Sequence, residues 1–176
     1  WATCNVGANK PEDYGDYFAW GETQPKSTYD WSTYKWCNGS YRTLTKYCTD
    51  SYYGTVDNKT KLELSDDAAR ANWGGSWRMP TKEECDELRQ ECNWSIINIY
   101  GVSGYKVTSK TNGNSIFLPL SGYYDEFGIN RHNLSGDYWS IQLDLQYSTN
   151  AYYMSFNSDE VTGYNHSRYY GRSVRA

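Results

Sequence analysis

Apolar and polar residues alternate near the end of the chain, along Asn150–Asn157. Successive side chains of a strand point to opposite faces, so a strand here has two unlike faces. The face with Met154 and Phe156 is predicted to be core, together with Tyr152. The opposite face, with Tyr153 and Ser155, is predicted to be a polar display that carries tyrosine.

A second alternating pattern covers Gly104–Leu120, where two runs rich in β-branched and aromatic residues flank Asn112-Gly113. Asn-Gly is the preferred dipeptide of a two-residue type I′ turn, so an antiparallel hairpin with that turn is expected. Shorter β-like segments are expected at Trp1–Val6 and Tyr14–Trp20. Trp31–Tyr53 shows no clean period and is predicted to be irregular, and Ser121–Ser135 is predicted to be a loop.

Two helices are predicted in the middle of the chain. Ser65–Ala71 begins with a capping residue and acidic side chains, and this helix should end before Gly74. Thr81 and Glu84 have the spacing of a capping box, which starts a second helix that runs to about Cys92. The order is therefore early β, two helices, then late antiparallel β. This order predicts an α+β fold in a single domain, residues 1–176, rather than a doubly wound sheet.

Composition indicates an aromatic core, because the chain has 19 Tyr and 8 Trp but only 4 Phe among its 176 residues. Hydrophobic residues make up only 38%. Tyr and Trp suit half-buried positions and contact surfaces. The expected core residues are spread over the whole chain: Trp73, Trp77, Leu88, Phe117, Trp139, Phe156 and Val174.

The net charge is -4, which argues against a nucleic-acid partner, since binding to phosphates depends on clustered Lys and Arg. No apolar run approaches the roughly 20 residues that cross a bilayer, so direct membrane insertion is not expected. The chain begins at Trp1 without a Met. We therefore expect a fragment trimmed from a longer product, with any export signal outside it.

The five cysteines, an odd number, contain no Cys-x-x-Cys pair, which argues against a zinc knuckle. A bridge between Cys37 and Cys48 would close a short loop. Cys85 and Cys92 would lie about 10 Å apart along one helix, too far for a disulfide. The alternative for every cysteine is a small buried apolar side chain.

The stretch Leu134–Ala176 is rich in Tyr, Asn, Ser and Asp. Evolved binding loops have a similar composition, because Tyr gives a large, stiff contact and small polar residues adapt their hydrogen bonds around it. The alternative is the solvated edge of a sheet in a protein that is rich in tyrosine.

Several longer motifs occur in one order along the chain: WATCNVGA at 1–8, YGDYFAWGE at 14–22, WGGSWRMPT at 73–81, NGNSIFLP at 112–119, YWS at 138–140 and YGRSVR at 170–175. With these motifs the chain resembles the Fibrobacter succinogenes major paralogous domain over nearly its whole length. This family is common in surface and secreted proteins of gut Bacteroidales. The resemblance implies a C-type-lectin-like fold, related in shape to formylglycine-generating enzymes.

Members of that family include variable proteins of diversity-generating retroelements, in which template adenines are mutated. The resemblance therefore implies a scaffold of about residues 1–133 and a variable segment of about 134–176. Randomised AAC or AAT codons cannot encode Gln, Glu, Met, Lys or Trp, so Gln142, Gln146, Met154 and Glu160 do not fit diversified positions. The positions that fit are Asp137, Leu143, Asp144, Leu145, Tyr147, Tyr153, Ser155, Asn157, Tyr164, Asn165 and His166.

The expected function is non-enzymatic binding at the surface of a cell or phage, or outside the cell. The ligand would be a protein or glycan on a host, microbial or phage surface, and no cofactor or metal is expected. The predicted contact face consists of Tyr138, Gln142, Asp144, Tyr147, Tyr153, Ser155, Asn157, Tyr164, Asn165, His166, Tyr169 and Tyr170. Alternatives are an undiversified structural module of a surface assembly and a calcium-independent carbohydrate-binding domain.

Catalysis is not expected from these motifs. The two histidines, His132 and His166, lie in polar late segments, and no nucleophile elbow, HExxH or phosphate loop occurs. No cysteine follows Cys92, so the cysteine chemistry of formylglycine-generating enzymes does not carry over. The Glu-Pro-Asn, Gln-Pro-Asp and Trp-Asn-Asp motifs of calcium-dependent lectins are absent.

Overall fold

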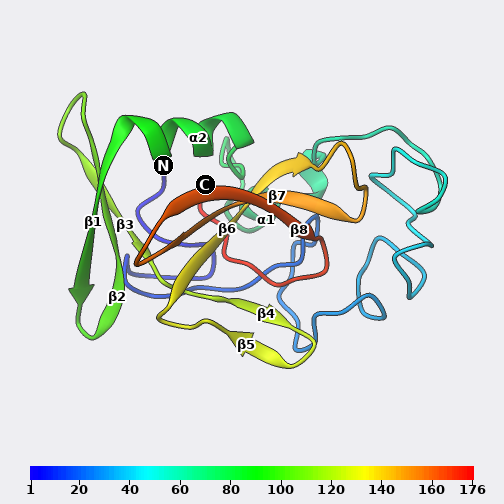
Figure 1. Ribbon diagram of the computed structural model, residues 1–176, viewed down its shortest axis with the longest axis horizontal. Helices are drawn as coiled ribbons and strands as arrows, with labels where there is room; N and C mark the ends of the chain where they lie inside the picture. Colours follow the sequence, from blue (N-terminus) through cyan, green and yellow to red (C-terminus); the bar gives the residue numbers. More distant parts are fainter.

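Strand β6 (Ser135–Leu143) is the centre of the fold in the computed structural model, which describes residues 1–176. It forms an antiparallel sheet in the order β6-β7-β8 with β7 (Asn150–Asn157) and β8 (Val161–Ser167). Helix α2 (Lys82–Glu91) packs along this sheet (Figure 1). The register between β6 and β7 shifts between Trp139 and Leu143.

Two further sheets flank this centre. Strands β1 (Cys92–Ile99), β2 (Val102–Ser109) and β3 (Ser115–Pro119) form a meander on one side, and β4 (Tyr123–Asp125) and β5 (Gly128–Asn130) form a small hairpin below (Figure 1). The 3-10 helix η1 (Leu64–Asp66) and helix α1 (Ala68–Trp73) precede α2. No helix is long and apolar enough to span a membrane.

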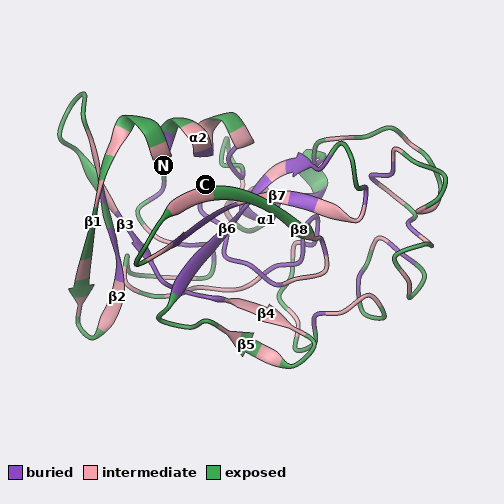
Figure 2. Cartoon of the chain, in the orientation of Figure 1, coloured by how far each residue is buried: buried purple, intermediate pink, exposed green.

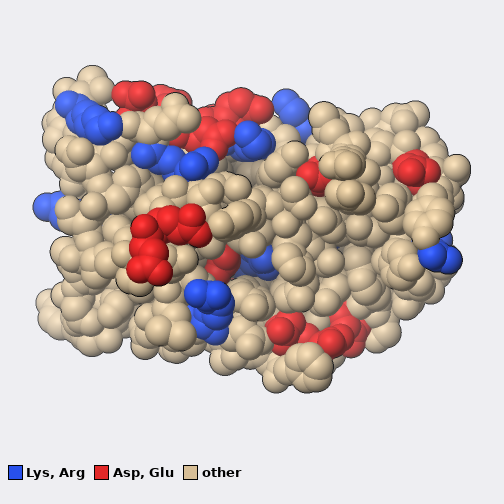
Figure 3. All heavy atoms as spheres, in the orientation of Figure 1, with Lys and Arg blue, Asp and Glu red and all other residues tan.

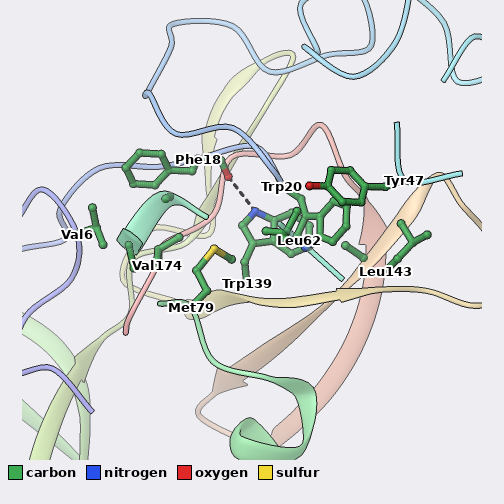
Figure 4. Packing of buried hydrophobic residues seen from close by; sticks show 12 residues of the cluster. Val6, Phe18, Trp20, Tyr47, Leu62, Met79, Trp139, Leu143 and Val174 are labelled. Carbon is green, nitrogen blue, oxygen red and sulfur yellow. Dashed lines mark hydrogen bonds between the residues drawn. The ribbon is translucent and has the colours of Figure 1, made fainter. Parts of the chain in front are cut away.

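Strand β6 is covered on both faces, and Figure 2 shows it buried along most of its length. Its Trp139 packs into a cluster with Phe18, Trp20 and Met79 (Figure 4), where the indole Nε1 donates a 2.8 Å hydrogen bond to the Phe18 carbonyl. The neighbouring Tyr138 points into a second cluster between α2, the β1-β2-β3 sheet and β7. Two apolar layers therefore meet at one strand.

The long segment before η1 contains no regular helix or strand. It is held by a third cluster of aromatic and small apolar side chains, which includes Tyr29, Tyr34 and Cys48. The guanidinium of Arg168 also ties it to the sheet, because Nη1 donates to the Tyr47 carbonyl at 2.6 Å and Nη2 to the Lys46 carbonyl at 3.0 Å. Buried carbonyls outside regular structure need such donors.

The two ends of the chain pair with each other. The Ala2 amide donates to the Ala176 carbonyl at 2.7 Å, and the Val6 amide donates to the Val174 carbonyl at 3.0 Å. The buried Arg175 reinforces this pairing, since its Nε donates to Asn5 Oδ1 at 2.8 Å. The N and C marks in Figure 1 accordingly lie close together.

The α+β class is confirmed, with mostly antiparallel sheets and two α-helices. The capping box is also confirmed: the Thr81 hydroxyl accepts from the Glu84 amide at 3.1 Å, and the Glu84 carboxylate accepts from the Thr81 amide at 2.8 Å. The helix expected at Ser65–Ala71 is present as η1 followed by α1, with Asp67 as the N-cap of α1.

Several local predictions are wrong. The loop between β2 and β3 is not a type I′ turn, because that turn needs positive φ at both central residues and only Gly113 has it. Trp1–Val6 forms no strand, and Tyr14–Trp20 contributes only an isolated bridge from Phe18 to Arg172. Strand β1 and the β4-β5 hairpin, which lies inside the expected loop, were not predicted from the sequence.

The expected core residues are buried with two exceptions. Leu88, Phe117, Trp139, Phe156 and Val174 are all buried. Trp77 instead remains 45% exposed, and Trp73 is only half-buried. Their rings contact each other edge to face at 5.5 Å, so the two indoles shield one another at the surface.

All five cysteines are unpaired thiols. Cys37, Cys48 and Cys85 are buried, as expected for small apolar side chains. Burial raises the pKa of the Cys85 thiol to about 12, so this thiol stays protonated at neutral pH.

Candidate ligand-binding cavity

A cavity of about 240 Å³ opens on the face of the molecule that carries β8. Strands β6, β7 and β8, the β4-β5 hairpin and the C-terminal segment all contribute side chains to it. In Figure 3, acidic and basic atoms lie next to each other at the top and near the centre of this face, and uncharged areas separate these groups. The lining residues are Tyr123, Arg131, Ser135, Asp137, Tyr153, Ser155, Asn157, Glu160, Tyr164, His166, Tyr170 and Arg172.

Arg172 is the most unusual residue of this cavity. It is only 2% exposed, and its Nε and Nη1 have no hydrogen-bond partner. The guanidinium carbon lies 3.9 Å from the ring centre of Tyr153 and 5.2 Å from that of Tyr170. Trp139 and Tyr123 surround it at 4.6 and 5.3 Å. Aromatic faces attract the positive charge, but they do not replace hydrogen-bond acceptors.

Asp137 lies in the wall of the same cavity and is 4% exposed. Its carboxylate accepts hydrogen bonds from the Ser135 hydroxyl at 2.7 Å and from the Ser155 hydroxyl at 2.9 Å. These hydroxyls hold the carboxylate in place on β6. None of the ion pairs of the chain joins it to Arg172. The cavity therefore has a fixed acceptor and a buried cation as separate groups.

The rim is made of tyrosine and polar side chains from β8 and the adjoining turns. Tyr164 is 45% exposed, and its hydroxyl donates to the Glu160 carboxylate at 2.9 Å. The His166 ring packs edge to face on Tyr170 with ring centres 4.6 Å apart. Burial of the ring and then the positive charge of Arg172 lower the pKa of His166. His166 is therefore neutral at pH 7.

The structure brings six of the predicted contact residues together around this cavity. They come from β7, from β8 and from the turn that precedes the final segment. These six are Tyr153, Ser155, Asn157, Tyr164, His166 and Tyr170. The face of β7 that was expected to display polar and tyrosine side chains thus borders the cavity.

Three predicted contact residues are buried away from the cavity, so the structure does not place them on this face. Tyr138 is 1% exposed, and its hydroxyl donates to the Pro119 carbonyl at 3.0 Å. Gln142 is bound to the start of α2, where its Oε1 accepts from the Lys82 amide at 2.7 Å. Asp144 accepts from the Gln146 and Tyr147 amides at 2.8 Å and shapes the turn after β6. All three belong to or follow β6, which is covered on both sides.

Three other predicted residues lie outside the cavity wall. Tyr147 is 45% exposed in the β6-β7 connection. Asn165 is exposed on β8, and its side chain accepts from Asn150 Nδ2 at 3.0 Å. Tyr169 is stacked on Tyr170 with ring centres 4.6 Å apart and also contacts Trp31.

The other six cavity residues were not among the predicted contact residues: Tyr123, Arg131, Ser135, Asp137, Glu160 and Arg172. Tyr123 and Arg131 fall in the segment expected to be a loop. Asp137 fitted a diversified codon but was not placed on the face, and Glu160 did not fit such a codon. Arg172 lies in the YGRSVR motif, inside the segment expected to vary, but it was not among the predicted contact residues. The pattern that could have revealed it is a charged residue between the Tyr169-Tyr170 pair and the apolar Val174.

A larger cavity of about 660 Å³ lies elsewhere, between α2 and the β2-β3 hairpin and beside both chain ends. None of the predicted contact residues lines it. Its charged residues include Arg78 and Glu84, which pair with each other at 2.6 Å. No buried polar side-chain atom without a partner faces this larger cavity, because such atoms occur only in Arg168 and Arg172. The larger cavity therefore has more volume but no buried side-chain donor or acceptor that a ligand would satisfy.

Comparison with known proteins gives no assignment: no family model, curated protein or solved structure matches this chain. No group of three or more His, Cys, Asp or Glu side chains is arranged to hold a metal ion. The cavity offers a buried guanidinium, a second arginine, two carboxylates, an imidazole, hydroxyls and tyrosine rings.

Proposed function

We propose that this protein is a non-enzymatic ligand-binding domain that acts outside the cell or on a cell or phage surface. The observation that supports this most is the cavity on the β8 face, where an unpartnered buried arginine is ringed by tyrosine and small polar side chains. A buried donor without an acceptor costs free energy, and a bound ligand can supply the acceptor. We also propose the C-type-lectin-like fold and membership in the Fibrobacter succinogenes major paralogous domain family. The motifs of the sequence support both assignments.

Diversification by a retroelement is part of this proposal, but at fewer positions than the codon pattern alone allows. Asp137, Leu143 and Asp144 fit diversified codons but are buried, so variation at these positions would disturb the fold. The codon-compatible residues near the cavity that are not buried are better suited to vary: Tyr153, Asn157, Tyr164, Asn165 and His166.

The genetic part is tested by sequencing the encoding locus for a reverse transcriptase and a near-copy of the segment for residues 134–176. We expect the near-copy to differ only at adenines and mainly at codons of exposed residues. A locus without such a copy would show that the protein is a fixed member and would remove diversification from the proposal.

The binding function is tested by screening the protein on glycan and protein arrays and then measuring variants against any ligand found. Tyr164→Ala should weaken binding at least tenfold, since this ring forms the exposed rim of the cavity. The matched control is Tyr100→Ala, because Tyr100 is 92% exposed in the β1-β2 turn and does not line the cavity. Equal loss in both variants, or no loss in either, would contradict the placement of the binding site.

A further inference from the structure

We propose that the cavity around Arg172 binds the carboxylate of an acidic sugar residue, of which a uronic acid is the simplest kind. This inference rests on the proposed binding function and names the class of its ligand. The cavity would recognise such a ligand in three ways. Arg172 would bind the carboxylate, the Asp137 and Glu160 carboxylates would accept hydrogen bonds from sugar hydroxyls, and tyrosine rings would pack against the sugar.

Arg172 has the unmet hydrogen-bonding capacity that an anion would satisfy. Arg168 and Arg175, the other arginines buried nearby, each donate to carbonyl groups of the chain. Arg172 is the one whose Nε and Nη1 both lack an acceptor. A guanidinium presents its donors as a planar fork that matches a carboxylate in a bidentate contact.

The surroundings of Arg172 make such a contact strong and keep it specific. Its side chain lies among Tyr123, Tyr153 and Tyr170, all of which line the cavity, so the guanidinium belongs to the cavity wall. Ion contacts gain strength where aromatic groups exclude water. The volume of about 240 Å³ is below the roughly 300 Å³ of the smaller drug-sized pockets, so it suits one sugar-sized group.

The charged residues of the cavity other than Arg172 are Arg131, Asp137 and Glu160, and the two carboxylates favour a sugar over an acidic peptide. Asp137 and Glu160 offer carboxylate oxygens, which only accept hydrogen bonds and therefore pair with hydroxyl donors. The same two carboxylates would repel a second negative charge on a peptide. Tyr153 and Tyr164 add ring faces, against which the apolar face of a sugar can pack. A ligand with one carboxylate and several hydroxyls meets all three conditions.

The test uses two small probes that differ only in the group proposed to meet Arg172. Methyl β-D-glucuronide carries a carboxylate where methyl β-D-glucoside carries a CH₂OH group. Binding to the wild-type protein is measured by titration calorimetry and by chemical shifts of arginine Nε–H signals in protein with labelled arginine. We expect the glucuronide to bind at least tenfold more tightly and to shift one Nε–H signal, and we expect sodium acetate to compete with it.

Variants assign the effect to Arg172. Arg172→Gln should weaken glucuronide binding at least tenfold and abolish the preference for the glucuronide over the glucoside. Arg42→Gln is the control, because Arg42 is exposed and does not line the cavity. Arg172→Lys keeps the charge but loses the fork, so it should weaken binding at least fivefold. If Arg172→Gln does not fold, the comparison of the two probes on the wild-type protein and the Arg172→Lys variant still test whether Arg172 binds the carboxylate.

Three results would overturn this inference. Equal affinity for glucuronide and glucoside would show that the carboxylate is not recognised. Tight binding of N-acetylglutamate amide without binding of the glucuronide would show that an acidic peptide side chain is the ligand. An unchanged spectrum with every probe would show that the cavity does not take acidic sugars. The proposed binding function is tested independently of the acidic-sugar inference. It would be contradicted if no ligand found on the arrays bound more weakly to Tyr164→Ala.

Discussion

At the scale of single residues, the three buried arginines near the end of the chain show how one side-chain type serves two purposes. Arg175 donates to Asn5 and to the Ala2 and Phe117 carbonyls, so its charge is fully used in joining distant segments. Arg168 holds carbonyls of the irregular segment in a similar way. Arg172 is surrounded by aromatic rings instead. Burial alone therefore does not distinguish Arg172 from Arg168 and Arg175, whereas counting hydrogen-bond acceptors does.

The tyrosines of the cavity differ in how much of the fold depends on them. Tyr153 packs on Trp139 and lies closest to the Arg172 guanidinium, so Tyr153→Ala should reduce the free energy of unfolding by about 2 kcal/mol. Tyr164 is a rim residue, and Tyr164→Ala should cost less than about 0.5 kcal/mol. Urea unfolding of the two variants measures the difference. Equal losses would mean that Tyr164 is also part of the packed core.

At the scale of elements, α2 shows a terminus that can be predicted from local sequence because its contacts are local. The capping box needs only Thr81 and Glu84, three positions apart. Arg78 adds two hydrogen bonds to the Glu84 carboxylate, at 2.8 and 2.6 Å. These bonds are the main reason that the pKa of Glu84 falls from 4.5 to about 2.

This lowered pKa predicts how stability depends on pH. Folding favours the ionised carboxylate, so the extra stability is fully present above pH 4.5 and is lost as the pH falls from 4.5 toward 2. Because Glu84 is partly exposed and screened by water, the effect should be about 1 kcal/mol. Glu84→Gln should lower the free energy of unfolding by that amount at pH 7 and by almost nothing at pH 2.

Urea unfolding at several pH values measures this dependence. Glu87→Gln is the matched control, because Glu87 lies on the same helix, is exposed and forms no ion pair. If the stability of Glu84→Gln depends on pH between 4.5 and 2 as steeply as that of the wild type, the Arg78 contact does not stabilise the fold.

Strand β6 shows the opposite case, in which an element can be predicted but its environment cannot. The sequence predicts strands in the last part of the chain, yet nothing local indicates that β6 has apolar layers on both faces. Tyr138 and Gln142 looked like display residues because their neighbours are polar. In the structure Tyr138 accepts from Asn5, 133 positions away, and Gln142 binds the start of α2. Contacts across such separations have no trace in the pattern of neighbouring residues.

The cavity, too, has a part that the local sequence predicts and a part that it does not. β7 and β8 form a local hairpin, and the alternation along β7 predicted that Tyr153, Ser155 and Asn157 share one face; all three line the cavity. Arg172 reaches the cavity only because the final segment turns back and pairs with Phe18. Its role in the cavity is a property of the tertiary fold, and the sequence alone left it as one arginine among several.

At the scale of the whole molecule, polar side chains join the irregular segment to the last part of the chain. Arg168 donates to the carbonyls of Lys46, Tyr47 and Ser148, and Ser148 Oγ accepts from the Thr49 amide at 2.9 Å. Arg168→Met should therefore loosen Trp31–Tyr53 while the β6-β7-β8 sheet remains folded. The carbonyls that lose their donors would otherwise remain buried and unpaired.

Limited proteolysis with mass spectrometry tests this expectation. Cleavage within Trp31–Tyr53 should become at least tenfold faster in Arg168→Met. Arg42→Met serves as the control, because Arg42 is an exposed residue of the same segment. Unchanged cleavage in Arg168→Met would mean that the aromatic cluster around Tyr29 and Tyr34 holds the segment without this arginine.

The paired chain ends also determine how the domain would respond to mechanical load. Ala2 and Ala176 lie at the open end of an antiparallel pairing that continues to Val6 and Val174. A force that pulls the two ends apart meets these hydrogen bonds one after another, as in unzipping, and does not shear them all at once. The domain should therefore open at low force when it is stretched through both termini.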